Sequence, residues 1–204
     1  DVQATADNMS PIRFPDSDRT EDKLSNMAIL IYTSGTTGLP KAAIVSWAKC
    51  IVGGTMGSRL LNRGDDIMYT VSTPLLLTSL STTPIANTLS QSMPLYHSSA
   101  AILSFCATVV SGSTQALGRK FSTKTFWKDV RDSGPTNIQY VGETLRYLLA
   151  APPQIDPITG ESLDKAHNVK AAFGNGLRPD IWNKFKARFG VETIAEFYAA
   201  TEGT

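Results

Sequence analysis

The feature that most constrains the fold is an apolar segment, residues 27–32 (Met-Ala-Ile-Leu-Ile-Tyr), which runs directly into a loop rich in glycine and hydroxyl groups. A continuous apolar run of this length is typical of a strand buried on both faces. After the loop, residues 42–45 form a predicted return strand, and Ser46 is a predicted N-cap for a helix that runs toward Leu61. The sequence therefore predicts a strand, a loop, a second strand and a helix in this order.

Strands and helices continue to alternate along the chain. In the last predicted helix Ile181, Phe185 and Phe189 recur on one face, Pro179 suits the first turn, and Gly190 ends the helix. This alternation predicts an α/β fold with mixed, mostly parallel sheets flanked by helices. The remaining predicted strands are 67–70, 138–141, 169–173 and 193–197, and the other predicted helices are 126–133 and 144–150.

Composition excludes several classes of function. The net charge of +1 gives no electrostatic reason to expect a nucleic-acid partner. Residues 67–118 carry no Lys, Arg, Asp or Glu, but prolines interrupt them, and their apolar runs are shorter than the roughly 20 residues of a spanning helix. The chain opens without a secretory signal, so we expect an intracellular protein. Cys50 and Cys106 lie far apart in the sequence and are expected to be buried small apolar residues in a reducing compartment.

The loop after the first strand carries the clearest chemical signal. Glycines let backbone N–H groups approach phosphate oxygens, hydroxyl groups add donors, and a lysine adds positive charge. The Walker pattern differs, since here two residues separate the glycines and Pro40 precedes the lysine. A flexible polar turn is the alternative interpretation. The predicted phosphate ligands are Thr33, Ser34, Gly35, Thr36, Thr37, Gly38 and Lys41.

The string of residues 32–41 resembles the phosphate-binding loop of the adenylate-forming superfamily, which contains acyl-CoA synthetases, luciferases and peptide-synthetase adenylation domains. Residues 94–98 resemble the motif whose histidine, here His97, lines the tunnel between acyl chain and nucleotide. Residues 173–179 resemble the segment along the adenine, and residues 196–203 resemble a motif that binds adenine, phosphate and Mg²⁺. The alternative interpretation of His97 is a structural histidine, and that of residues 173–179 is a glycine-rich turn. By this resemblance, Gly174, Asn175, Gly176 and Tyr198 bind adenine, Thr201 contacts phosphate, and Glu202 binds the metal.

Two stretches, 139–147 and 174–182, narrow the resemblance to fatty acid transport proteins and very-long-chain acyl-CoA synthetases. The resemblance implies that a fatty acid carboxylate attacks ATP to give an acyl-adenylate, and that the thiol of CoA then displaces AMP. It also implies ATP, Mg²⁺ and CoA as required molecules, and places residues 140–143 beside the acyl tunnel. Ala195 departs from the pattern, because many members carry glycine there. The implied catalytic residues are Lys41, His97, Thr201 and Glu202.

The resemblance further implies that residues 1–204 are the central part of a large N-terminal domain whose C-terminal partner domain lies elsewhere. Such a piece is expected to make no acyl-CoA by itself. Residues 1–26 contain no pattern that predicts a structure or a function. We expect an intracellular, peripherally membrane-associated parent protein, in peroxisome, endoplasmic reticulum, lipid droplet or plasma membrane. Three alternatives stay open: a membrane-associated fatty acid transporter without essential ligase activity, an adenylating enzyme for another carboxylic acid, and a non-functional gene fragment.

Residues 71–91 interrupt the family pattern. The segment contains no charged, aromatic or glycine residue, unlike most solvent loops, and its deletion restores the family spacing. Codons for its two ends can supply 5′ and 3′ splice signals. We therefore hypothesise that residues 71–91 are a retained in-frame intron of a eukaryotic, fungal gene; a true surface insertion is the alternative.

Overall fold

The computed structural model describes residues 23–33, 40–59, 66–71, 95, 97–118 and 120–201. Two separate sheets are present in these residues: an antiparallel pair, β1-β2, and a five-stranded parallel sheet in the order β4-β3-β5-β6-β7. The predicted α/β fold with mixed, mostly parallel sheets is thus confirmed. The strands are β1 (Met27–Thr33), β2 (Lys41–Ser46), β3 (Ile67–Val71), β4 (Thr114–Gly118), β5 (Asn137–Val141), β6 (Ala171–Asn175) and β7 (Thr193–Glu196).

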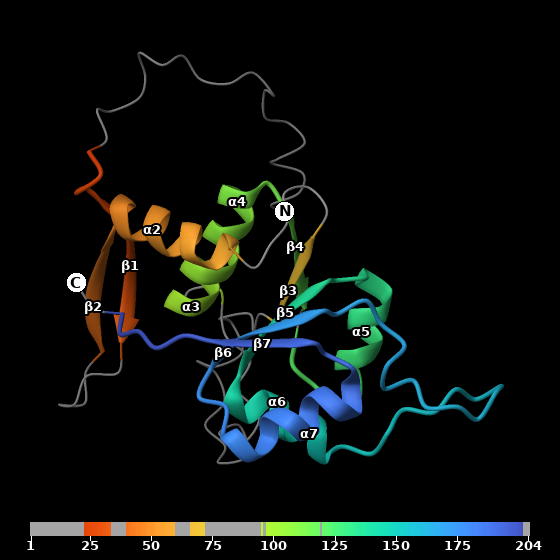
Figure 1. Ribbon diagram of the computed structural model, residues 1–204. Coiled ribbons are helices and arrows are strands. Elements are labelled where there is room, and N and C mark those ends of the chain that lie inside the picture. Colours follow the sequence, from red (N-terminus) through yellow and green to blue (C-terminus); the bar gives the residue numbers. More distant parts are fainter. Residues whose placement is uncertain are drawn as a thin grey trace, which may run out of the picture.

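Helices cover both faces of the parallel sheet. Figure 1 shows α2, α3 and α4 on one side of it and α5, α6 and α7 on the other. Between α3 and α4 the chain forms a π-helix, η4, so that residues 98–111 make one continuous helical segment. The helices are α2 (Trp47–Ser58), α3 (Ser98–Ala100), η4 (Ala101–Cys106), α4 (Ala107–Ser111), α5 (Phe126–Ser133), α6 (Gly142–Ala150) and α7 (Pro179–Phe189).

Local sequence signals explain where several helices begin and end. The Ser46 side chain caps α2 by accepting a hydrogen bond from the Lys49 backbone N–H at 3.3 Å. Gly134 and Gly190 end α5 and α7 in the left-handed region, with φ of 62° and 73°. Pro179 occupies the first turn of α7. These helix boundaries agree with the sequence predictions because they depend on neighbouring residues.

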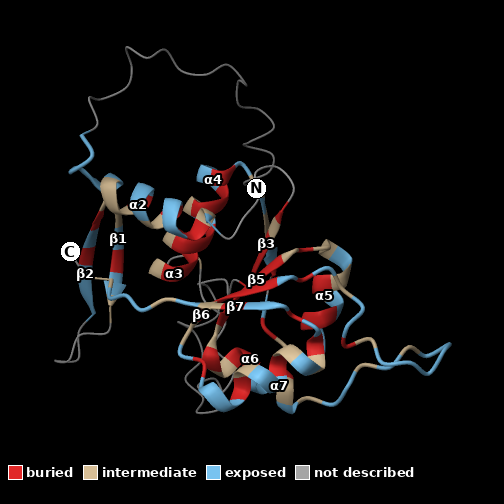
Figure 2. Cartoon of the chain, viewed as in Figure 1, coloured by how far each residue is buried: buried red, intermediate tan, exposed pale blue. Residues whose placement is uncertain are grey.

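The main apolar core lies between the parallel sheet and the layer formed by α5, α6 and α7. Figure 2 shows the buried residues on the inner faces of these elements. Phe185 and Phe189 of α7 are buried, as predicted, and both rings pack against Trp127 of α5. Trp127 also stacks on His167, with ring centroids 4.5 Å apart. Aromatic packing thus fixes α5 against α7.

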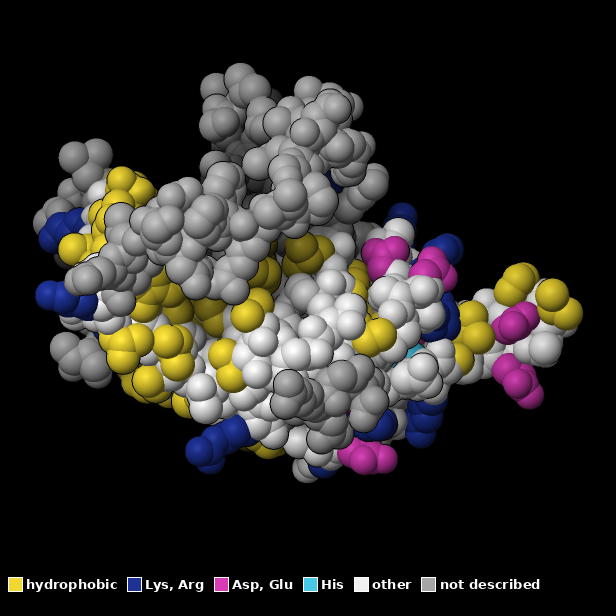
Figure 3. Space-filling view, turned by 90° about the horizontal axis from the view of Figure 1, so that it is seen from above, with side chains coloured by type: hydrophobic (Ala, Val, Ile, Leu, Met, Phe, Trp, Pro, Cys, Tyr) yellow, Lys and Arg dark blue, Asp and Glu magenta, His cyan; other side chains and the backbone are white. Residues whose placement is uncertain are grey.

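Helix α2 packs unusually closely against η4 and α4. A Cβ atom added to Gly57 would lie 2.6 Å from the Leu103 carbonyl oxygen, and one added to Gly54 would lie 2.9 Å from the Cys106 carbonyl oxygen. Glycine is therefore required at both positions for this approach. The outward sides of the same helices carry apolar side chains, and Figure 3 shows hydrophobic groups gathered on this face. The exposed members on α2 are Trp47, Ile51, Val52 and Met56.

Some sequence predictions need correction. Strand β1 is not buried on both faces: Ile31 is buried, but Leu30 and Tyr32 are 43% and 64% exposed. The reason is that β1 pairs with β2 in a two-stranded sheet, with its buried residue packed toward Val45 and Cys50. Strand β6 begins two residues later than the predicted 169–173.

Two elements escaped the sequence prediction, β4 and the helical segment 98–111. The five residues of β4 alternate too weakly to indicate a strand, and apolar residues follow one another so closely in the helical segment that no helical period stands out. Of the suspected insertion, Val71 is the last residue of β3, and residues 72–91 lie outside the described residues.

Within the described residues, no helix combines the length and the apolar character needed to cross a bilayer.

Candidate functional site

The parallel sheet has a crevice where its connections diverge. From β3 the chain passes through the helical segment 98–111 to β4, whereas from β5 it passes through α6, on the opposite face, to β6. Ligands of open α/β sheets bind at such switch points, beyond the carboxyl ends of the strands. Strands β3 and β5 pair only at Met68↔Asn137 and Tyr69↔Ile138, so they separate beyond these residues. A small hollow opens there, lined by Thr70, Val71, Phe121, Gln139, Tyr140, Val141 and Thr144.

The His97 segment and the Thr201 segment meet at this edge of the sheet. The hydroxyl groups of Ser98 and Thr201 form a hydrogen bond of 3.0 Å, although 103 positions separate them in the sequence. On the sheet side, the buried Gln139 amide donates to the Ser99 carbonyl oxygen at 2.8 Å. The start of the helical segment 98–111 is therefore tied both to the sheet and to the chain after β7.

Glu196 fixes the predicted adenine segment. Its carboxylate oxygen Oε1 accepts hydrogen bonds from the Leu177 backbone N–H at 2.6 Å and from the Tyr140 hydroxyl at 3.3 Å. The Phe197 N–H also donates to the Gly174 carbonyl oxygen at 3.0 Å. Burial, together with the charge and hydrogen bond of Glu196, raises the pKa of Tyr140, so its hydroxyl stays a donor. Sequence reasoning missed this role, because nothing local shows what Glu196 contacts.

Two glycines allow the predicted adenine segment, residues 174–176, to approach the turn between β5 and α6. A Cβ atom on Gly174 would lie 2.2 Å from the Tyr140 carbonyl oxygen, and one on Gly142 would lie 1.9 Å from the Gly176 carbonyl oxygen. Real Cβ atoms do not come so close to another atom. Gly176 has a positive φ of 74°, which also favours glycine. The sequence predicted residues 174–176 as a binding segment, while the matching requirement at Gly142 appears only in the structure.

His97 caps the helical segment that carries Ser98. Its Nδ1 accepts a hydrogen bond from the Ser99 backbone N–H at 3.3 Å, which requires this nitrogen to be unprotonated. Desolvation lowers the pKa of His97 below its usual value, even though part of the side chain is exposed. The ring is therefore neutral near pH 7 and carries its proton on Nε2, where it can donate a hydrogen bond.

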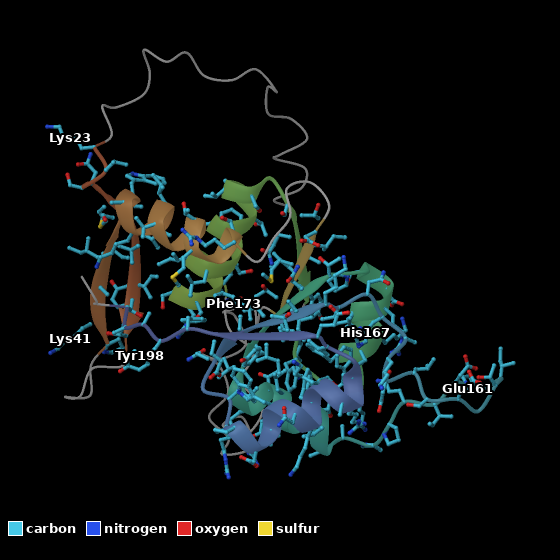
Figure 4. The ribbon with its side chains drawn as sticks, in the orientation of Figure 1. Lys23, Lys41, Glu161, His167, Phe173 and Tyr198 are labelled. Carbon is cyan, nitrogen blue, oxygen red and sulfur yellow. The ribbon has the colours of Figure 1, made fainter. Side chains whose placement is uncertain are left out.

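The predicted phosphate ligands lie partly within the described residues. Thr33 and Lys41 are paired at the loop end of the β1-β2 hairpin, and the Thr33 hydroxyl donates to the Lys41 carbonyl oxygen at 3.4 Å. Lys41 is exposed, and so is the whole ring of Tyr198. In Figure 4 both side chains appear in the region of the hairpin's loop end. Outside the described residues lie Ser34, Gly35, Thr36, Thr37, Gly38 and Glu202, so their predicted roles stay predictions.

One feature of the adenine segment fits a nucleotide. The side-chain oxygen of Asn175 is buried and has no hydrogen-bond partner within the described part of the chain. A buried acceptor of this kind needs a donor, and the amino group of adenine is one. For Mg²⁺, the described residues contain no group of three or more His, Cys, Asp or Glu side chains that could hold a metal ion. The metal prediction therefore depends on Glu202, outside those residues.

A second, larger cavity of about 840 Å³ lies beside α6, and mostly apolar groups line it. Phe121 lines both this cavity and the hollow between β3 and β5. The side chain of Phe121 is buried and packs against Phe126 with ring centroids 6.0 Å apart. The other lining residues include Lys120, Lys124, Tyr147, Pro152 and Pro153.

Comparisons with known proteins agree with this geometry. A family profile described as AMP-binding enzyme matches residues 2–204. The chain is 46% identical over 175 residues to the Very long-chain fatty acid transport protein of Saccharomyces cerevisiae, which covers 86% of this chain and 22% of that protein. It is 39% identical over 180 residues to the Medium/long-chain-fatty-acid–CoA ligase FadD6 of Mycobacterium tuberculosis, covering 86% of this chain and 25% of the ligase.

Among solved structures, ATP-bound MatB from Rhodopseudomonas palustris superimposes with a TM-score of 0.66 over 98% of this chain and 34% of that chain. At 17% sequence identity this match shows a shared fold. The chain thus spans about a quarter of the length of the curated relatives that it matches.

Proposed function

Because this chain belongs to the AMP-binding enzyme family, we propose that the protein containing it ligates a long- or very-long-chain fatty acid to CoA, consumes ATP and forms AMP. The observation that carries the proposal is the convergence of three motif segments. The Ser98–Thr201 hydrogen bond joins the His97 motif, residues 94–98, to the motif at residues 196–203. Glu196 of that last motif accepts a hydrogen bond from the Leu177 N–H, which joins it to the motif at residues 173–179. The fatty acid is proposed from the names of the relatives, a transport protein and a fatty acid–CoA ligase.

In the proposed first step, the fatty acid carboxylate attacks the α-phosphate of ATP and pyrophosphate leaves. Negative charge moves among phosphate oxygens, so preorganised donors and a cation lower the barrier. Lys41 and the backbone of residues 33–38 hold the β- and γ-phosphates, and Thr201 contacts phosphate. Glu202 would hold Mg²⁺, which would supply further charge neutralisation. Neutral His97 donates a hydrogen bond from its Nε2–H to a carboxylate oxygen of the fatty acid and orients that oxygen toward the phosphate.

The adenine lies between the 174–176 segment and Tyr198 in this proposal. The exposed ring of Tyr198 supplies a flat surface for stacking, and the buried oxygen of Asn175 accepts a hydrogen bond from the adenine amino group. In the second step the thiol of CoA attacks the acyl-adenylate, and AMP leaves.

We place the acyl chain in the cavity beside α6. Its apolar lining and its volume of about 840 Å³ suit a long hydrocarbon chain, and Phe121 separates it from the hollow at the strand ends. A Phe121→Trp variant should then lose more activity toward long acids than toward short ones, whereas Tyr147→Phe should keep the profile. Equal losses for all chain lengths in Phe121→Trp would contradict this placement.

The decisive experiment is acid-dependent exchange of pyrophosphate with ATP, run against a panel of acids. The experiment uses the whole protein that the gene encodes, including any sequence that flanks residues 1–204. Lys41→Met and Thr201→Val should abolish exchange, while Thr201→Ser should retain most of it, because serine keeps the hydroxyl that meets Ser98. Exchange that Thr201→Val and Lys41→Met leave unchanged would refute the proposal. Strongest exchange with an acid other than a fatty acid would refute the substrate class and favour an adenylating enzyme for that acid.

Fatty acid uptake is the second candidate function, and the name of the yeast relative favours it. Uptake that is coupled to ligation requires the same nucleotide site. The two functions can therefore be distinguished only in a variant that lacks ligation. In cells, Glu202→Ala should abolish both uptake and ligation if activation traps the fatty acid. Uptake that persists in this variant without ligation would favour a transporter whose ligase activity is dispensable. The peripheral membrane association and organelle predicted from the sequence are part of this second proposal.

We also propose that residues 1–204 are the central part of a larger nucleotide-binding domain and make no acyl-CoA by themselves; turnover by the purified 204-residue chain would refute this. For residues 71–91, the retained-intron proposal predicts that the mature transcript joins the codons of Thr70 and Ser92. A mature message that still encodes Leu75 to Leu80 would refute it.

A further inference from the structure

A buried polar layer lies between the parallel sheet and the helical segment 98–111. On the sheet side it contains Thr70 of β3 and Gln139 of β5, and on the helix side it contains Ser104 of η4. The Thr70 hydroxyl lies 2.6 Å from the Ser104 hydroxyl and donates to the Gln139 Oε1 atom at 3.2 Å. Polar groups are costly to bury, so a layer of them at this place indicates that it fixes a particular contact.

The layer is connected to His97 through the backbone of Ser99. The Gln139 Nε2 atom donates to the Ser99 carbonyl oxygen at 2.8 Å, and the Ser99 N–H donates to the His97 Nδ1 atom at 3.3 Å. Ser99 and Gln139 are buried, whereas His97 is exposed. The amide of Gln139 therefore determines how the first turn of α3 lies against the sheet, and with it the position of the His97 ring.

The orientation of the Gln139 amide depends on Thr70. An amide has a donor end and an acceptor end, and a flipped amide would bring its oxygen against the Ser99 carbonyl oxygen. The Thr70 hydroxyl donates to Oε1 and so holds Nε2 toward Ser99. Thr70 thus acts on His97 through two intermediate groups, the amide of Gln139 and the backbone of Ser99.

A count of protons supports this direction of the hydrogen bond. The hydroxyl groups of Thr70 and Ser104 have one proton each, so only one of them can donate to the other. If Ser104 donates, the Thr70 proton goes to Gln139, and the Thr70 oxygen also accepts from the Gln115 Nε2 atom at 3.0 Å. If Thr70 donates to Ser104 instead, the buried Oε1 of Gln139 loses its hydroxyl donor, which is unfavourable. The first arrangement is therefore the more stable.

We propose that Gln139 is a positioning residue for the adenylation step, and that Thr70 orients its amide for this task. Through Ser99, Gln139 holds the His97 ring where its Nε2–H meets the carboxylate of the fatty acid. For this role neither Gln139 nor Thr70 has to touch the fatty acid or ATP. The inference rests on the proposed ligase function and deepens it.

Amide hydrogen exchange of the natural full-length protein, followed by mass spectrometry, tests the position of Ser99 without reference to activity. Gln139→Met keeps the length of the side chain but forms neither hydrogen bond, Thr70→Val keeps the shape without the hydroxyl, and Thr70→Ser keeps the hydroxyl. A peptide that contains the Ser99 N–H should exchange about tenfold faster in Gln139→Met and in Thr70→Val than in the wild-type protein. Thr70→Ser should stay near the wild-type rate. Unchanged exchange in Gln139→Met and Thr70→Val would overturn the proposal.

Pyrophosphate exchange with a fatty acid then tests whether the position matters for the reaction. With kcat counted per ATP-binding site, so that unfolded protein does not contribute, Gln139→Met and Thr70→Val should lower kcat about 10–100-fold. The KM for ATP should stay near the wild-type value, and Thr70→Ser should restore most of kcat.

A double variant separates positioning of His97 from a general structural role. If Gln139 acts through His97, Gln139→Met should lower kcat by no more than about twofold in a His97→Ala background. An equal fractional loss with and without His97 would overturn the positioning role while leaving the ligase function intact. Absence of exchange with any fatty acid in the wild-type protein would instead overturn the proposed function, and the adenylation role of Gln139 with it.

Discussion

The close contact between Gly142 and Gly176 gives a sharp test of how the predicted adenine segment, residues 174–177, is held. In Gly142→Ala the new methyl carbon would lie 1.9 Å from the Gly176 carbonyl oxygen and 2.9 Å from the Leu177 nitrogen. These neighbours are backbone atoms, so the segment itself has to move by about 1 Å or more. That movement strains or breaks the 2.6 Å hydrogen bond between the Leu177 N–H and Glu196.

The expected loss of stability follows from three contributions. Overpacking costs about 1–3 kcal/mol, and loss of a hydrogen bond to a charged group costs about 1.5–3 kcal/mol. Alanine is the better helix former by up to about 1 kcal/mol, and Glu196 is exposed enough to rebind water, which favours the lower end of the hydrogen-bond range. The free energy of unfolding should therefore fall by about 2–4 kcal/mol.

Urea unfolding followed by circular dichroism measures this loss, and equilibrium ATP binding measures its effect on the site. Gly160→Ala is the matched control, because Gly160 has a φ of 75° with open space around it. It should cost only about 1–2 kcal/mol of backbone strain and leave ATP binding unchanged. If Gly142→Ala unfolds within about 0.5 kcal/mol of the wild-type protein and binds ATP normally, the proposed contact does not hold the segment.

Gly57→Ala should lower the free energy of unfolding by about 1–2 kcal/mol, because its Cβ atom would lie 2.6 Å from a backbone oxygen of η4. The control Val52→Ala, on the exposed side of α2, should change the free energy of unfolding little. Equal urea midpoints for the two variants would contradict the close packing of these helices. Desolvation lowers the pKa of both His97 and His167, so the unfolded chain binds protons more readily and stability should decrease as pH falls below about 6.5. His167→Asn should reduce this slope by up to about 1.4 kcal/mol per pH unit, and an unchanged slope would exclude His167 as a source. Tyr198→Ala should leave the urea midpoint unchanged, since the ring is fully exposed, but weaken ATP binding by about 0.5–1.5 kcal/mol; unchanged ATP affinity would remove Tyr198 from the site.

Strand β1 illustrates the limit of sequence reasoning about burial. Its apolar run correctly predicted a strand, because β-forming residues in succession favour extended backbone. Burial on both faces did not follow, since burial depends on which elements cover the strand. Within the described residues β1 pairs with β2, and Leu30 and Tyr32 remain exposed.

The sequence by itself determined the features that depend on neighbouring residues: the strand that precedes the predicted phosphate loop, the cap at Ser46, and the helix ends at Gly134 and Gly190. It also located the motif segments, because residue types in a fixed order are visible without a fold. Only the tertiary structure decided which distant residues meet, such as Ser98 with Thr201 and Tyr140 with Glu196. Such contacts depend on strand order and helix crossing, which nothing in a local stretch of sequence encodes.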